Sequence, residues 1–144
     1  MLKSIEVYLV TDGNGEEAVE FYRDALGAEL VYMTKWGEHV PDCPPERANL
    51  VLNAQLSVNG IRLMISDENP DFEYTAGSNM TAALITDAAE TAHELYKKLS
   101  VNAKSILMEM QETFWSPAYA GLTDQFGMNW QISAEVEGFV PTVE

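Results

Sequence analysis

Two carboxylates beside a tryptophan are the side chains in this sequence that best suit acid–base chemistry. Glu109 and Glu112 flank Gln111 at the end of a predicted strand, and Trp115 follows. Strict alternation along residues 104–111 would put Glu109 and Gln111 on one face and the neighbouring methionines on the other. A carboxylate among apolar neighbours has a raised pKa and can act as a general base, so Glu109 and Glu112 are catalytic candidates. The alternative is that either carboxylate ties down a loop through backbone hydrogen bonds.

Metal or nucleophile chemistry has a weaker candidate in His39 and Cys43, which stand four residues apart. Such a pair needs further ligands or an orienting group held rigidly. The chain has only two histidines and one cysteine, and prolines interrupt residues 35–48. We therefore expect no metal, and we expect residues 35–48 to form a long solvated loop without regular structure.

Polar and aromatic side chains at alternating strand positions indicate a neutral, amide-bearing pocket. Such a pocket suits a small planar or amphipathic molecule, although each aromatic residue could instead belong to the core. The residues that we expect to line or rim the cavity are Tyr8, Asn53, Gln55, Met64, Ser66, Gln111, Phe114, Trp115, Trp130 and Gln131.

Two similar halves are needed to position these side chains. The first half reads as a strand, a helix and three strands, at residues 4–11, 14–26, 28–33, 50–58 and 61–66. Asn14 and Glu17 form a candidate capping box for the helix, and Asn59-Gly60 predicts a type I′ hairpin turn. Residues 67–78 read as a polar, solvated linker. The second half repeats the pattern, with strands at 82–87, 104–110, 118–122 and 129–134 and a helix through 92–99.

The fold class predicted from this pattern is α+β, with two tandem βαβββ modules, about 1–66 and 79–136, in a single domain spanning 1–144. One helix covers only one face of each sheet. Pairing the modules would leave a curved inner surface free, and a concave cleft between repeats is a natural place for a small-molecule site.

Charge and composition exclude several classes of protein. Eight Lys and Arg against 23 Asp and Glu give a formal net charge of −15, so nucleic acid and anionic membrane surfaces are unfavourable partners. No apolar run is long enough for a membrane span, and the first residues lack the apolar core of a signal peptide. Together with the single cysteine, these features predict a cytoplasmic protein.

Several motifs carry a resemblance to a known family. The most specific are Gln111-Glu112-Thr113-Phe114-Trp115 and Thr123-Asp124-Gln125-Phe126-Gly127-Met128-Asn129-Trp130, supported by Gly13-Asn14-Gly15-Glu16-Glu17-Ala18, Phe21-Tyr22, Leu26-Gly27-Ala28-Glu29-Leu30, Ala54-Gln55-Leu56 and Leu63-Met64-Ile65-Ser66-Asp67. Over nearly its whole length the chain resembles the PhnB-like (YjdN-like) branch of the vicinal oxygen chelate superfamily, which includes glyoxalase I, extradiol dioxygenases and bleomycin resistance proteins. The resemblance implies a glyoxalase/bleomycin resistance-type cup and a homodimer.

The resemblance also bears on metal binding. Metal-dependent members of the superfamily hold a divalent ion through His and Glu side chains. The matching positions here fall near Val7 or Tyr8, near Thr81 and on Gln131, and Asn53 stands where the branch often has a histidine. Amide and hydroxyl groups supply no anionic charge to offset the desolvation of the ion, so we expect a metal-free cup with no cofactor.

The expected function is therefore that of a PhnB-like protein of unassigned activity that binds a small molecule in its cup. Two alternatives stay open. The first is a divalent-metal-dependent lyase, isomerase or dioxygenase, with Glu109 or Glu112 as ligand or base. The second is a drug-sequestering protein like the bleomycin-binding members, which the negative charge would favour for cationic ligands.

Overall fold

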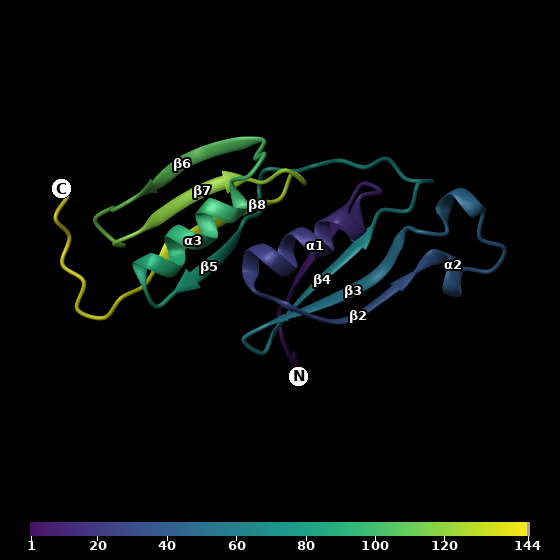
Figure 1. Cartoon of the computed structure of the whole chain (residues 1–144), viewed down its shortest axis with the longest axis horizontal. Helices are drawn as coiled ribbons and strands as arrows, with labels where there is room; N and C mark the ends of the chain where they lie inside the picture. The colour runs from purple at the N-terminus through teal and green to yellow at the C-terminus, as the bar shows by residue number, and fades with distance from the viewer. Residues whose placement is uncertain (144) are drawn as a thin grey trace. The chain divides into compact units, whose positions relative to one another are not determined.

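Two βαβββ modules of the same topology make up the chain (Figure 1). In this computed structural model, which describes residues 1–143, the modules belong to two compact units, Met1–Thr75 and Ala76–Glu144. Each unit has a four-stranded mixed sheet with one long helix on one face. The predicted α+β class with two tandem modules is confirmed, and the cup between them stays a prediction.

The N-terminal unit contains one sheet with the strand order β1-β4-β3-β2. Its elements are β1 (Val7–Thr11), α1 (Gly15–Leu26), β2 (Glu29–Lys35), α2 (Trp36–His39), a 3-10 turn η1 (Pro45–Arg47), β3 (Val51–Val58) and β4 (Ile61–Asp67). Strand β1 runs parallel to β4, and the other neighbours are antiparallel. Asn59 and Gly60 both have positive φ, 49° and 78°, as the predicted type I′ turn requires.

Helix α1 packs on this sheet through small side chains and one tyrosine. Gly27 ends the helix in the left-handed conformation, with φ of 63°, and its N–H bonds to the carbonyl of Arg23. The buried apolar side chains of the unit are Leu9, Ala18, Val19, Tyr22, Ala25, Val51, Ala54, Leu56, Leu63 and Ile65. The opposite face of the sheet has no helix on it within the unit.

The start of α1 differs from the predicted capping box. Asn14 makes no side-chain capping bond. Instead Asp67, 7% exposed at the end of β4, accepts hydrogen bonds from the N–H groups of Gly15 at 2.8 Å and Val51 at 2.7 Å and from the Thr11 hydroxyl at 2.7 Å. Asp67 therefore belongs to the core and not to a solvated linker, because three donors from other elements converge on its carboxylate.

The segment predicted as a structureless loop, residues 35–48, contains the short helix α2 and the turn η1. One carboxylate explains part of this order. Glu38 Oε2 accepts hydrogen bonds from the Thr34 hydroxyl at 2.8 Å and the Lys35 N–H at 2.9 Å, and these bonds lower the Glu38 pKa. His39 is exposed, and the Cys43 thiol donates to the carbonyl of Pro44 at 3.5 Å.

The C-terminal unit repeats the topology with the strand order β5-β8-β7-β6. Its elements are β5 (Ala82–Thr86), α3 (Ala89–Leu99), β6 (Ser105–Gln111), β7 (Tyr119–Thr123) and β8 (Asn129–Ala134). Helix α3 lies on one face of this sheet (Figure 1). The buried apolar side chains are Ala92, Leu99, Ala118, Ala120, Leu122, Phe126, Trp130, Ile132 and Ala134. No helix within residues 1–143 is long and apolar enough to cross a membrane.

Candidate functional site

The uncovered face of the N-terminal sheet carries five of the predicted site residues. Each lies next to a buried residue on β1, β3 or β4 and therefore points away from α1: Tyr8, Asn53, Gln55, Met64 and Ser66. The register sets Tyr8 opposite Met64 and Met64 opposite Gln55, so these three side chains form one row across the sheet. The structure thus brings this part of the predicted set together.

Asn53, two residues before Gln55 on β3, links the two polar members of this row through hydrogen bonds. We call Tyr8, Asn53 and Gln55 together the hydrogen-bonded row. The Asn53 side-chain amide donates to the Tyr8 hydroxyl at 2.9 Å, and the Gln55 amide donates to Asn53 Oδ1 at 3.1 Å. The bonds fix the orientation of both amides and leave the Tyr8 O–H and the Gln55 carbonyl oxygen without a partner among the described residues. Tyr8 is 46% exposed. The surface therefore offers one hydrogen-bond donor and one acceptor beside exposed apolar atoms.

The uncovered face of the C-terminal sheet holds an aromatic cluster. Trp115 makes edge-on contacts with Phe114 and Tyr119, with ring centroids 4.7 and 5.1 Å apart. The Tyr119 hydroxyl donates to Gln131 Oε1. Gln111 lies opposite Tyr119 in the register, so the predicted residues Gln111, Phe114, Trp115 and Gln131 gather around a tyrosine that the sequence analysis did not select.

Trp130 departs from its expected place on the cavity surface. It is 2% exposed, and its indole N–H donates to Asp124 Oδ2 at 2.8 Å. It lies next to Gln131 in β8, and successive strand residues point to opposite faces, so the two could not both face the cavity. Asp124 also accepts from the N–H groups of Phe126 and Met128. Trp130 therefore belongs to the hydrogen-bond network that stabilises the β7–β8 turn.

The two catalytic candidates, Glu109 and Glu112, lie in different surroundings. Glu109 is exposed, and two register shifts between β6 and β7 remove the alternation on which its predicted placement depended. Glu112 Oε2 accepts from the Thr142 N–H at 2.8 Å and the Thr142 hydroxyl at 2.6 Å. These bonds lower the pKa of Glu112, opposite to the raised pKa that a general base would need. The geometry of Glu112 is that of a tether for the C-terminal segment.

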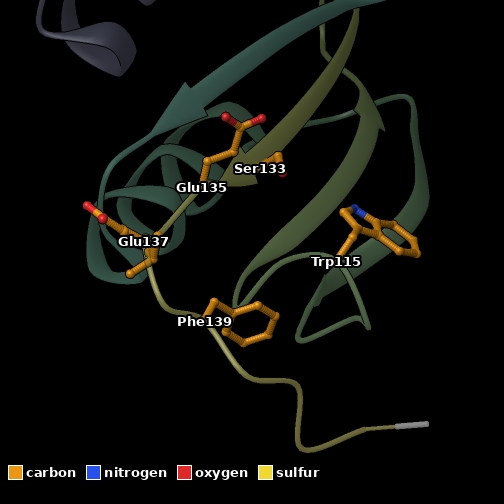
Figure 2. A pocket seen from close by; sticks show the side chains of 6 residues that line it. Trp115, Ser133, Glu135, Glu137 and Phe139 are labelled. Carbon is orange, nitrogen blue, oxygen red and sulfur yellow. The ribbon is translucent and has the colours of Figure 1, made fainter.

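A hollow of about 470 Å³ lies at the end of β8 within the C-terminal unit. Figure 2 shows Trp115, Phe139 and the neighbouring Ser133 and Glu135 on different sides of it, with the Glu137 carboxylate directed away from the two rings. The lining residues are Trp115, Ser133, Glu135, Val136, Glu137 and Phe139. Of these only Trp115 was selected from the sequence. Ser133 lies two residues after Gln131 on β8, so strand alternation puts it on the same face and could have predicted it. Residues 135–139 follow the last strand and show no periodicity from which they could be predicted.

The side chains at the positions implied for a metal do not fit a divalent cation. Tyr8 and Asn53 are engaged with each other, Gln131 accepts from Tyr119, and none of the three is anionic. Hard divalent ions prefer carboxylate oxygens, and transition metals also take imidazole. Within residues 1–143, no group of three or more His, Cys, Asp or Glu side chains is arranged to hold a metal. We therefore derive no metal-dependent step.

Comparisons with known proteins agree with this architecture. The pattern of the Glyoxalase/Bleomycin resistance protein/Dioxygenase superfamily matches residues 4–132. The chain is 32% identical over 138 residues to protein YjdN of Escherichia coli K12, covering 88% of this chain and 91% of YjdN. The solved structure of PA1353 from Pseudomonas aeruginosa has a TM-score of 0.85 at 29% identity and covers 94% of this chain and 100% of PA1353.

A third similar structure, the PhnB protein of Bacillus cereus, has a TM-score of 0.74 at 24% identity and covers 92% of this chain and 100% of that one. The members that give the superfamily its name act on or bind small molecules. The match along the chain and the two repeated sheets lead to one conclusion: this chain belongs to the glyoxalase/bleomycin resistance protein/dioxygenase superfamily and is YjdN-like within it.

Proposed function

We propose that the protein binds a small, planar, uncharged molecule on the uncovered face of the N-terminal sheet, where Tyr8, Asn53 and Gln55 form their hydrogen-bonded row. The observation that carries the proposal is that this row is pre-oriented and yet exposed. Two amides and a phenol already held in place lose little conformational freedom when a ligand binds.

The same row indicates the chemistry of the ligand. The Tyr8 O–H can donate and the Gln55 carbonyl oxygen can accept, so a matching molecule carries both an acceptor and a donor, as a carboxamide does. Met64 lies between these two residues in the register and supplies a polarizable apolar surface for a flat ring. An anionic ligand is disfavoured by the net charge of −15.

Benzamide is a suitable probe, with benzoate as the anion of the same shape. In NMR titrations, benzamide should shift the side-chain amide signals of Asn53 and Gln55, and benzoate should shift them little. Replacing Asn53 by Leu removes both hydrogen bonds and should weaken benzamide binding by about tenfold, which corresponds to one or two hydrogen bonds.

Asn79→Leu is the matched control, because Asn79 is an exposed asparagine of the other unit. It should leave benzamide binding unchanged. Equal benzamide affinity in the wild type and in Asn53→Leu would contradict the proposed site, provided that the variant shows the circular dichroism spectrum of the folded protein.

We further propose that the chain forms a homodimer in the cytoplasm. The resemblance to the superfamily supports a dimer, and one free, half-buried cysteine, Cys43, is consistent with a reducing compartment. Sedimentation equilibrium would return twice the chain mass for the dimer, whereas a single chain mass at micromolar concentration would contradict it.

A further inference from the structure

The hollow at the end of β8 combines aromatic walls with carboxylates that no basic side chain neutralises. Glu135 and Glu137 form no ion pair or side-chain hydrogen bond with any residue in 1–143. Both are among the residues that line the hollow together with Trp115 and Phe139, and Figure 2 shows the Glu137 carboxylate directed away from the two rings. Carboxylates and aromatic faces share one preference, because each attracts a positive charge.

The basic residues of the unit lie toward the other end of its sheet. Lys97 and Lys98 are in the last turn of α3, which begins after β5 ends and returns toward the start of that strand. Lys104 Nζ lies near Gly127, just before β8 begins, and β8 runs parallel to β5. The hollow, by contrast, includes Glu135 just beyond the end of β8. Charge is therefore separated along the unit, with the negative end at the hollow.

The aromatic walls are held in place by their own contacts. Trp115 is fixed by its edge-on contacts with Phe114 and Tyr119 and still exposes 46% of its surface. Phe139 sits in the C-terminal segment, where its N–H bonds to the carbonyl of Val136, and Glu112 holds Thr142 three residues later. The Trp115 ring is thus positioned before any ligand arrives, and the backbone that carries Phe139 is held at two points.

One hydroxyl in the hollow is available to a ligand. Ser133 is 9% exposed and lines the hollow, and its hydroxyl has no hydrogen-bond partner among residues 1–143. No buried side-chain oxygen or nitrogen in these residues lacks a partner, so the Ser133 hydroxyl is the accessible part of this otherwise buried residue. A polar group on the ligand, next to its positive charge, would supply a partner for it.

We propose that this hollow is a binding site for a small organic cation, an ammonium or quaternary ammonium group that carries a neighbouring hydroxyl. Trp115 and Phe139 form the cation–π contacts, Glu135 and Glu137 balance the charge, and Ser133 bonds the hydroxyl. The size of the hollow is in the range of small-molecule sites. This site differs in residues and in ligand charge from the one proposed on the N-terminal sheet.

Choline tests the proposal, with dimethylbutanol as the uncharged isostere in which carbon replaces the quaternary nitrogen. In NMR titrations of the full chain, choline should cause saturable shifts of the Trp115 indole signal, which is assigned through Trp115→Phe. The affinity for dimethylbutanol should be at least about tenfold lower, since the cation–π and carboxylate interactions need the charge.

Charge variants separate a local site from the general negative field. The double variant Glu135→Gln/Glu137→Gln should weaken choline binding by about tenfold, and Glu94→Gln, an exposed carboxylate on α3, should change it less than twofold. Equal loss in Glu94→Gln, equal affinity for dimethylbutanol, or no shift at tens of millimolar choline would each overturn the proposal. Asn53→Leu leaves this titration unchanged, so failure here and failure of the proposed N-terminal site are distinguishable.

Discussion

The two units share one topology but keep their buried carboxylate at different corners. In the N-terminal unit, Asp67 joins β4 to the end of β1 and to the starts of α1 and β3. In the C-terminal unit, the residue paired with the equivalent threonine is Ala134, and the buried carboxylate is Asp124 in the β7–β8 turn. There the Ser116 hydroxyl donates to the carbonyls of Ala118 at 3.0 Å and Ala134 at 2.7 Å.

The β3–β4 and β7–β8 connections differ in the opposite way, because here the C-terminal unit uses a carboxylate and the N-terminal unit does not. The β3–β4 connection needs no side chain, because Asn59 and Gly60 adopt the required positive φ angles. The longer β7–β8 connection depends on Asp124, which accepts from backbone N–H groups and from Trp130. The comparison teaches that the topology specifies which corners must be held, while the choice of polar residue at each corner is free.

Truncation of the two aspartates should have unequal effects. Asp67→Ala leaves the N–H groups of Gly15 and Val51 buried without an acceptor and should lower the unfolding free energy by about 4 kcal/mol. Asp124→Ala breaks two bonds within its own turn and one from the Trp130 indole six residues later, so its effect is more local and should cost about 2 kcal/mol. Urea unfolding followed by circular dichroism measures both values.

Asp12→Ala and Asp87→Ala are the matched controls. Both aspartates are exposed and each follows the threonine that ends the first strand of its unit. These variants should change the unfolding free energy by less than about 0.5 kcal/mol. A larger cost at Asp124 than at Asp67 would reverse the comparison and place the more important lock in the turn.

Alanine should be less stable than glycine at the first residue of α1 and more stable than glycine at the first residue of α3. A Cβ atom on Gly15 would lie 2.8 Å from Asp67 Oδ2 and 2.9 Å from the Thr11 hydroxyl. Gly15→Ala should therefore destabilise the protein by about 2 kcal/mol, despite the higher helix propensity of alanine. Helix α3 begins with Ala89, and Ala89→Gly should cost about 0.5 kcal/mol.

Measuring Gly15→Ala in an Asp67→Ser variant tests whether contact with Asp67 causes the predicted loss of stability. With the carboxylate gone, the close contacts with both Asp67 oxygens are removed and only the one with Thr11 is left, so Gly15→Ala should cost less there than in the wild type. If the cost is the same in both backgrounds, contact with Asp67 is not its origin.

Local rules were sufficient where local interactions decide the structure. The Asn59-Gly60 turn depends on the φ preferences of two residues, and the apolar period of α1 places its buried face. On β1 and on the part of β3 that follows its irregularity between Val51 and Asn53, alternation also placed Tyr8, Asn53 and Gln55 on the uncovered face. These three side chains are the part of the candidate site whose position followed from the sequence.

Long-range partners and irregular pairing explain what the sequence did not show. Asp67 looks like a linker residue until Thr11 and Gly15, more than 50 positions earlier, converge on it. The register shifts of β6 displace Glu109 from the expected alternation. Phe139 lies beyond the last strand, where no period applies, and its place depends on the distant contact between Glu112 and Thr142.

Glu112 sharpens the comparison because it accepts two hydrogen bonds, against three at each buried aspartate, and faces solvent. Its lowered pKa means that the tether is fully present above the ordinary pKa of a glutamate and is lost as pH falls through the lower folded-state pKa. The Thr142 amide signal should follow this titration in the wild type and lose it in Glu112→Gln, while urea unfolding changes little in that variant because water replaces the lost bonds. Glu109→Gln, which alters an exposed carboxylate three residues earlier on β6, should leave the Thr142 signal unchanged. If Glu112→Gln instead destabilised the fold as much as Asp67→Ala, burial would not be what determines how much each carboxylate stabilises the protein.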